Sequence, residues 1–194
     1  MKANDNVRTA DGRRQRSERS QEAIIVACLS LMNEGNLVPT AQQISDRAGV
    51  GIRSFFRHFT DMDTLFTAVD ERIRSSYEEL FVFSGDGDSA LDERIVNMVD
   101  TFSFAWEQLT LLMMSTKAQL WRSTAMRKNY GRSQRALFKE VERWLPEAAS
   151  LPKDERNALD AVTSFEFWER LRKHQGLSAK ATRSVLVAMI TRFF

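Results

Sequence analysis

The chain has 194 residues, 43% of them apolar and 28% charged, so it is long enough to bury a sizeable core in one or two domains. Its 8 glycines and 3 prolines are about half the share of an average protein, which argues against turn-rich β-sandwiches, barrels, collagen and disordered linkers. The net charge is only +2, and the single cysteine, Cys28, excludes an internal disulfide framework and a multi-cysteine zinc site.

The three prolines are spaced so that none falls between Thr40 and Leu145. Proline costs about 3 kcal/mol inside a helix, so this stretch is free to be helical almost throughout. We therefore predict an all-α chain. No apolar signal core follows the basic N-terminus, and the apolar runs are far shorter than the ~20 residues that span a membrane, so we expect a cytoplasmic protein.

Positive charge is concentrated at the start of the chain. Residues 1–60 carry nine Lys or Arg against six Asp or Glu, whereas the remainder carries nineteen against twenty. An excess of positive charge at one end indicates an anionic partner there, and nucleic acid is the first candidate.

Residues 1–19 are polar and rich in arginine, with almost nothing to bury, so we predict a flexible basic arm. From Ser20 the apolar residues Ile24, Ala27, Cys28 and Leu31 recur at helical spacing, and Gly35 ends the helix. This places Cys28 on a core face, as a small buried hydrophobic residue rather than a redox group.

Two short helices follow. Thr40 and Gln43 have the spacing of a capping box, which predicts a helix from Ala41 that stops at Gly49. A second short helix is predicted from about Gly51 to His58, with two phenylalanines on its buried side. Two short helices joined by a tight turn containing glycine have the plan of a helix-turn-helix motif, here over about residues 40–59.

The rest of the chain also reads as helices. Asp61 caps one that extends to about Phe83, and a break at 84–88 follows, where Asp86 and Asp88 match too little of a calcium loop to favour it over a solvated linker. Further helices are predicted at 89–120, 124–145, 153–175 and 179–194. We expect about nine helices in all, three short and basic and six longer, in a helix-turn-helix domain over 20–65 and a larger helical domain over 66–194.

The stretch from Ala23 to Val69 resembles the DNA-binding domain of the tetracycline-repressor (TetR) family. The resemblance rests on many positions at fixed spacing: Ala23, Gly35, Thr40, Ile44, Ala48-Gly49-Val50, Phe55-Phe56, His58-Phe59 and Leu65. Beyond these residues only the all-α layout and the length agree with the family.

The resemblance implies a homodimeric transcription regulator, usually a repressor, whose third helix enters the major groove of a palindromic operator and whose C-terminal domain binds a small effector. The N-terminal residues of such a helix point at base edges. Arg53 would then read guanine and Ile52 would pack on a thymine methyl. The expected DNA contacts are Arg13, Arg14, Arg16, Thr40, Gln42, Gly51, Ile52, Arg53, Ser54, Phe56, Arg57 and His58.

Two positions depart from the family pattern. Phe56 stands where the family mostly has a tyrosine whose hydroxyl meets a phosphate, and Met62 stands where a lysine is frequent. The arginine-rich arm would compensate by reaching the minor groove or the backbone.

The larger domain carries bulky and polarizable side chains that predict a pocket for a hydrophobic or aromatic effector, although each of them also fits plain core packing. These are Trp106, Met113, Met114, Trp121, Phe165 and Trp168. The last two predicted helices carry apolar stripes that suggest a two-fold symmetric four-helix dimer interface. The residues expected there are Ala158, Ala161, Val185, Leu186, Met189, Ile190 and Phe193, together with Phe165 and Trp168.

Other functions find less support in the sequence. His58 and His174 are the only histidines, and there is no phosphate-binding glycine motif, so neither a metal, a cofactor nor an enzyme activity is expected. Two alternatives stay open: an effector-independent, architectural DNA-binding protein, and a protein-binding module built on the same helices.

Overall fold

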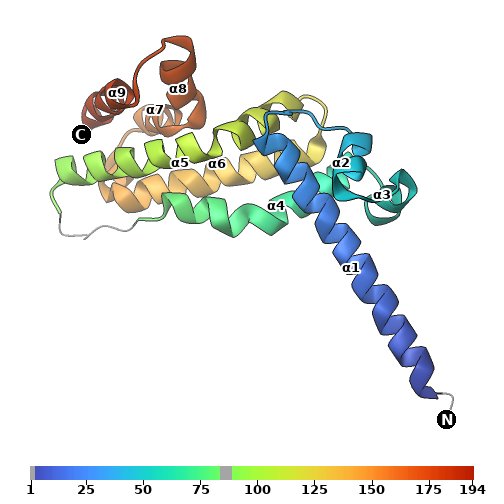
Figure 1. Ribbon diagram of the computed structural model, residues 1–194. Helices are drawn as coiled ribbons and strands as arrows, with labels where there is room; N and C mark the ends of the chain where they lie inside the picture. Colours follow the sequence, from blue (N-terminus) through green and yellow to red (C-terminus); the bar gives the residue numbers. More distant parts are fainter. Residues whose placement is uncertain (1–2, 84–88) are drawn as a thin grey trace. The chain divides into compact units, whose positions relative to one another are not determined.

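The computed structural model describes residues 3–83 and 89–194, and for residues 3–11 and 13 it describes the backbone alone. Over these residues the chain is all-α, with nine α-helices and no strand, as predicted (Figure 1). The predicted linker at 84–88, with the calcium-loop alternative at Asp86 and Asp88, lies outside the described residues.

The chain divides into two compact units. The first comprises Met1–Arg72 and Met114–Lys128, and the second comprises Ile73–Met113 and Asn129–Phe194. The first unit therefore takes in a stretch around residue 120 that the sequence had assigned to the C-terminal domain. The three helices α4 (Met62–Glu78), α5 (Leu91–Gln119) and α6 (Thr124–Trp144) each contribute residues to both units.

In the first unit, α1 (Ala3–Asn33) packs against α2 (Ala41–Ala48) and α3 (Ile52–His58). The core is formed by side chains that are at most 1% exposed, among them Ile24, Cys28, Met32, Ile44, Phe55, Phe59 and Leu65. Cys28 is buried as expected, and burial raises the pKa of its thiol to about 12, which leaves it protonated and unreactive.

Helix α1 differs from the sequence expectation at its start. We predicted a flexible arm over residues 1–19, but the backbone is helical from Ala3. The composition of this segment explains the difference: Arg, Gln, Glu and Ala are good helix formers, and the Arg14 guanidinium lies 2.9 Å from the Glu18 carboxylate one turn later. At its other end the helix stops before Gly35, which has φ 92, as predicted.

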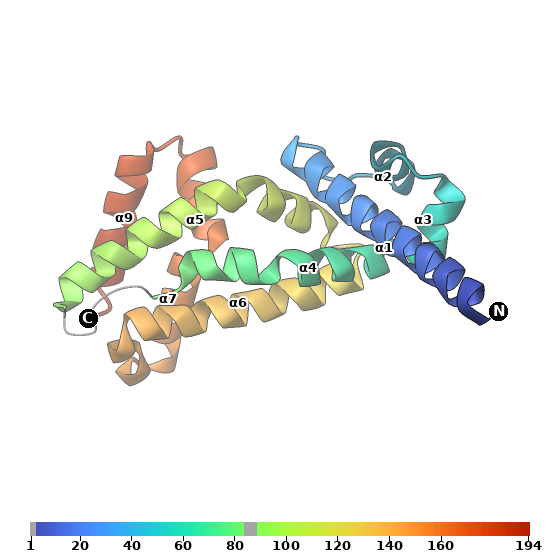
Figure 2. The ribbon, with the colours of Figure 1, turned by 60° about the horizontal axis from the view of Figure 1, so that its bottom comes forward.

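The second unit contains most of α5 and most of α6, and the two helices run in opposite directions (Figures 1 and 2). Helix α4 ends at Glu78, somewhat earlier than predicted, and continues as a 3₁₀ turn, η1 (Glu79–Phe81). Helix α6 ends at Trp144 and is followed by a second 3₁₀ turn, η2 (Pro146–Ser150), where the proline fits because the first residues of a turn lack N–H partners anyway.

The prediction of one continuous helix over 153–175 is wrong, because the stretch is interrupted near its middle. It is divided into α7 (Lys153–Thr163), α8 (Phe165–Glu169) and a π-helical segment η3 (Arg170–His174). Ser164 breaks it, because its backbone is extended (φ −72, ψ 159) and its hydroxyl caps α8 by accepting the N–H of Phe167. Helix α9 (Ala179–Thr191) follows, capped by Ser178, and packs against α7.

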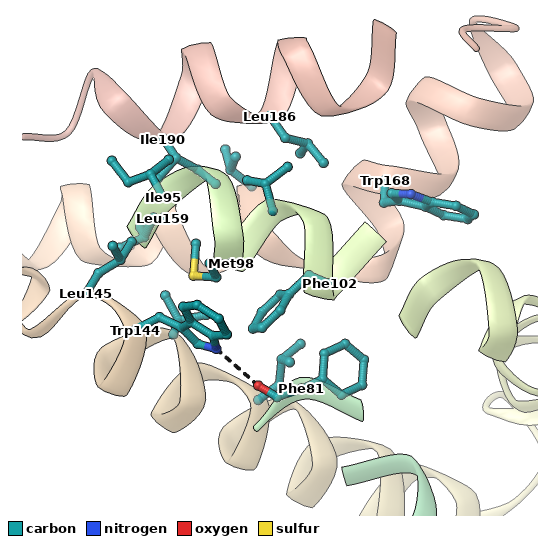
Figure 3. Close-up of a cluster of buried hydrophobic side chains, with 14 of the residues drawn as sticks. Phe81, Ile95, Met98, Phe102, Trp144, Leu145, Leu159, Trp168, Leu186 and Ile190 are labelled. Carbon is teal, nitrogen blue, oxygen red and sulfur yellow. Dashed lines mark hydrogen bonds between the residues drawn. The ribbon is translucent and has the colours of Figure 1, made fainter. Parts of the chain in front are cut away.

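The core of the second unit joins α5, α6, α7, α8 and α9 through buried aromatic and aliphatic side chains (Figure 3). Trp144 is 2% exposed, and its indole N–H donates to the Phe81 carbonyl at 3.2 Å, which ties α6 to η1. No helix over the described residues is long and apolar enough to cross a membrane.

Candidate nucleic-acid interface

The local sequence sets the geometry of α2 and α3. The Thr40 hydroxyl accepts the Gln43 N–H at 3.2 Å, and the Gln43 side-chain oxygen accepts the Thr40 N–H at 2.9 Å, which confirms the predicted capping box. Gly49 ends α2 in the left-handed region (φ 67), where a side chain would be strained. The chain then turns tightly, and α3 begins at Ile52.

Helix α3 has one buried and one exposed face. Phe55 is fully buried and Phe59 is 1% exposed, so both belong to the core, as predicted. Arg53, Phe56 and Arg57 are exposed on the other side of the helix, with Phe56 at 50%. The site predicted on this helix is completed by Gly51, which is exposed at its N-terminus, and by the half-buried Ile52, Ser54 and His58.

The polar groups on α3 are partly organised by one another. The Arg57 guanidinium donates to the Ser54 hydroxyl at 2.8 Å, which holds both side chains on one face of the helix. Burial, and then the neighbouring charge of Arg57, lower the pKa of His58 below its ordinary value.

The other expected DNA contacts lie on α2 and α1. Thr40 and Gln42 are exposed at the start of α2, where the Gln42 amide donates to Asp46 at 2.7 Å. Arg14 and Arg16 are exposed along α1, and the Arg16 side chain donates to the Gly12 carbonyl at 3.2 Å. The side chain of Arg13 lies outside the described residues.

An ion pair that the sequence did not reveal braces α1 against α2. The two terminal nitrogens of Arg47 each lie 2.6 Å from an oxygen of Glu34, and one of them also donates to the Ser30 hydroxyl at 2.8 Å. The hydrogen bond from Arg47, supported by Ser30, lowers the pKa of Glu34 to about 2. Arg47 therefore positions α2 rather than adding a free charge to its surface.

Two further attachments hold the helix-turn-helix segment at both ends. Ahead of α2, the Leu37 carbonyl accepts from the Ser115 hydroxyl at 2.7 Å and from the Gln119 amide at 3.2 Å, near the end of α5. After α3, Asp63 accepts from the Ser123 hydroxyl at 2.6 Å and from two backbone N–H groups at the start of α6. Figure 1 shows the α5–α6 turn beside the loop that leads from α1 to α2.

Comparison with known proteins identifies the fold of the chain by its similarity to solved structures. No family model matches the sequence, and no curated protein matches it at a significant level. A solved structure named as a transcriptional regulator from Streptomyces coelicolor A3(2) is similar with TM-score 0.63 and 19% identity, over 90% of this chain and 98% of that one. A structure named as a TetR-family transcriptional regulator from Rhodococcus sp. is similar with TM-score 0.61 and 16% identity, over 91% and 98%. The chain has the TetR-family fold.

Within this TetR-family fold, the second unit contains a small cavity. Its volume is about 10 Å³, roughly the room that one water molecule needs. Its walls come from α5, the α7–α8 junction and α9, and they are formed by Met98, Val99, Phe102, Trp106, Val162, Thr163, Ser164, Trp168, Leu186 and Ile190. This space is far smaller than an ordinary ligand needs.

The residues predicted to line an effector pocket fall in different places. Trp106 and Trp168 line the cavity, and Phe165 is fully buried between them, with ring centroids 5.5 and 5.7 Å from theirs. Met113 packs at the edge of the same core. Met114 belongs to the first unit, as does Trp121, which is 79% exposed because it lies in the turn where α5 ends and the chain reverses.

The residues predicted for a dimer interface also separate into groups. Leu186 and Ile190, on α9, are 5% and 1% exposed, and Phe165 and Trp168 are equally buried, so all four serve the core of their own subunit. Ala158 and Ala161 on α7 are exposed, whereas Val185, Met189 and Phe193 are half-buried. Over residues 3–83 and 89–194 no group of three His, Cys, Asp or Glu side chains has a metal-binding arrangement.

Proposed function

We propose that the chain is a sequence-specific DNA-binding transcription regulator that acts as a cytoplasmic homodimer and carries out no catalytic step. The observation that carries the proposal is helix α3: it presents Arg53, Phe56 and Arg57 outward, opposite two phenylalanines that fix it to the core. A helix of this kind fits the major groove, and an exposed arginine near its N-terminus has the reach to bind guanine bidentately.

The charges around α3 support the same function. Arg14 and Arg16 on α1 and Arg57 on α3 are exposed, and positively charged side chains around a recognition helix contact phosphates irrespective of sequence. Thr40 and Gln42 are exposed at the N-terminus of α2, where the backbone N–H groups and the helix dipole favour a phosphate.

Selection of binding sequences from a random duplex library tests the proposal. A two-fold symmetric sequence should be enriched, with half-sites about 34 Å apart, or one helical turn. Footprinting on the DNA that flanks the gene should then protect a site of this kind. Binding to all sequences with equal affinity, or to none, would contradict a role as a sequence-specific regulator.

We further propose that the regulator is a repressor released by a small hydrophobic effector, which enters the core of the second unit beside Trp106 and Trp168. The small volume of the cavity requires this core to open, and the break at Ser164 is the point where α8 can move away from α7. Addition of a binding compound should raise the melting temperature and release the labelled operator duplex.

The small volume of the same cavity favours a second candidate, a DNA-binding protein that needs no effector. A substitution in the core of the second unit distinguishes the effector-released repressor from the effector-independent protein. Trp168→Ala would enlarge the cavity by most of an indole, and the variant should bind small aromatic compounds if the site is accessible. If a compound that binds this variant leaves its DNA affinity unchanged, the effector-independent function is supported.

A further inference from the structure

The sequence between Gln108 and Lys139 has an unusual charge distribution. It contains seven Lys or Arg and no Asp or Glu, whereas residues 61–107 contain three Lys or Arg and twelve Asp or Glu. Nearly balanced totals for the whole chain conceal this second basic region. Its centre is the α5–α6 turn, which belongs to the first unit together with the helix-turn-helix segment.

The turn displays an aromatic ring beside these positive charges. Trp121 is 79% exposed, whereas the other three tryptophans are each at most 4% exposed. Arg122 and Lys128 are exposed as well, and among the described residues no carboxylate lies within ion-pair distance of either. The exposed indole leaves a large apolar ring in contact with water, which costs free energy unless a partner covers it.

The shape of the turn is fixed by Arg127. Its guanidinium donates to the Leu120 carbonyl at 2.7 Å, to the Trp121 carbonyl at 3.3 Å and to the Thr124 hydroxyl at 2.9 Å. These bonds hold the backbone on either side of Trp121, so the ring projects from an ordered turn rather than from a loose one.

The turn is also attached to the helix-turn-helix segment at both ends. Ser115 and Gln119 bind the Leu37 carbonyl, three residues before Thr40, and Ser123 binds Asp63, shortly after α3 ends. Both attachments are made by hydrogen bonds of 2.6 to 3.2 Å, which tie the basic turn to the residues that precede α2 and to those that follow α3. The turn is therefore attached next to both ends of the segment that carries α3.

We propose that Trp121, Arg122 and Lys128 form a second DNA contact, on the phosphate backbone outside the groove that α3 enters. This inference rests on the proposed DNA-binding function. Arginine and lysine neutralise phosphates, and the indole N–H donates to a phosphate oxygen while its ring packs on the deoxyribose. Such a contact adds affinity and fixes the orientation of the duplex, but reads no sequence.

Tryptophan fluorescence tests the contact directly, because acrylamide should quench mainly Trp121 while the buried tryptophans are shielded. We expect a duplex of roughly 30 bp, three helical turns, to lower the acrylamide quenching constant at least about twofold. Trp121→Phe should remove the quenchable component with and without DNA. If quenching of the wild-type protein is the same when the duplex is bound, the proposal is overturned.

The salt dependence of binding tests the two cations. Each phosphate contact contributes about 0.9 to the slope of log K against log salt, so R122A/K128A should reduce the slope by about 1.8 for each subunit bound. The control R135A/K139A removes two exposed charges of the same acid-free stretch that lie in the second unit, and its slope should equal that of the wild type. Equal slopes for R122A/K128A and the wild type would overturn the proposal.

Failure of this contact is distinguishable from failure of the proposed function. If the wild-type protein binds no duplex at all, both are overturned. If the wild-type protein binds DNA, but R122A/K128A leaves the salt slope unchanged and the duplex leaves the quenching of Trp121 unchanged, only the second contact is overturned. Shielding of Trp121 by phosphatidylserine vesicles but not by duplex would assign the turn to a lipid surface instead, and would also overturn the DNA contact.

Discussion

The Asp63 carboxylate, in the first turn of α4, caps a different helix: it accepts the Ser123 hydroxyl at 2.6 Å and the backbone N–H groups of Thr124 and Ala125 at 3.1 and 3.2 Å. Ser123 in turn accepts the Met126 N–H at 3.0 Å, so one carboxylate and one hydroxyl satisfy most of the N–H groups at the start of α6. This cap joins the helix-turn-helix segment to the α5–α6 turn.

Asp63→Ala should lower the free energy of unfolding by about 1–3 kcal/mol, because it leaves a buried hydroxyl and two helix N–H groups without their charged acceptor. Urea denaturation measures the change. The matched control is Asp92→Ala, an exposed acidic residue in the first turn of α5 that caps no other helix, for which a change below about 0.5 kcal/mol is expected. Equal effects of the two substitutions would show that the cap contributes nothing specific.

The structural features that could be predicted from the sequence are those whose residues lie only a few positions apart in the chain. Thr40 and Gln43 are three residues apart and Gly49 directly follows its helix, so cap and stop were both predicted correctly. Asp63 and Ser123 are 60 positions apart, and Ser115 and Leu37 are 78 apart, so no periodicity connects them. The same limit applies to the apolar stripe on α9, which is evident in the sequence. Which of its residues are buried, as Leu186 is, and which are only half-buried, as Val185 is, depends on how α5 and α7 pack against α9.

The brace between Glu34 and Arg47 makes stability depend on pH. The Arg47 hydrogen bond lowers the pKa of Glu34 to about 2 from an ordinary value near 4.5, so the native state favours the ionised form. Its contribution is therefore complete above about pH 4.5 and is lost as the pH falls from there towards 2. Melting temperatures between pH 7 and pH 3 should fall less steeply for Glu34→Gln than for the wild type.

The size of this pH effect should respond to salt, because both side chains of the pair are substantially exposed to solvent. Adding salt should narrow the difference between Glu34→Gln and the wild type at neutral pH. Parallel pH profiles at low salt would mean that the pair does not stabilise the attachment of α2 to α1.

Arg53 is the residue we expect to read a base. Arg53→Ala should cost about 1–3 kcal/mol on the best operator and should relax base preference at one position of each half-site. Joint replacement of Arg13, Arg14 and Arg16 with alanine should instead weaken binding to every duplex alike and reduce the salt slope. Competition titrations against specific and random duplexes distinguish these outcomes, and equal losses on both for Arg53→Ala would contradict its reading of a base.

Phe56 offers a gain of function. Its ring is 50% exposed on the face of α3 that carries Arg53, so Phe56→Tyr places a hydroxyl where a phosphate is expected and should raise DNA affinity by about 0.5–1.5 kcal/mol. Phe104→Tyr is the control, since Phe104 is 54% exposed on α5, in the second unit. A gain from both substitutions, or from neither, would place the Phe56 ring away from the DNA backbone.

Dimerisation should depend on the outward sides of α7 and α9, not on the residues of the α9 stripe that face inward. Ala158 and Ala161 are exposed on α7, and small side chains there permit close approach of a partner helix, with the half-buried Val185, Met189 and Phe193 beside them on α9. A two-fold axis through this surface would bring two α7–α9 pairs into a four-helix bundle.

Ala158→Glu with Ala161→Glu should therefore give a folded monomer of 22.3 kDa that loses most of its operator affinity, because one subunit contacts only half of a palindrome. Leu186→Glu with Ile190→Glu should behave differently and unfold the subunit, since both side chains are buried and a carboxylate there has no partner. Sedimentation equilibrium and circular dichroism on the two double variants separate loss of assembly from loss of fold. A wild-type protein that sediments as a monomer at micromolar concentration, or an Ala158→Glu/Ala161→Glu variant that remains dimeric, would remove α7 and α9 from the interface.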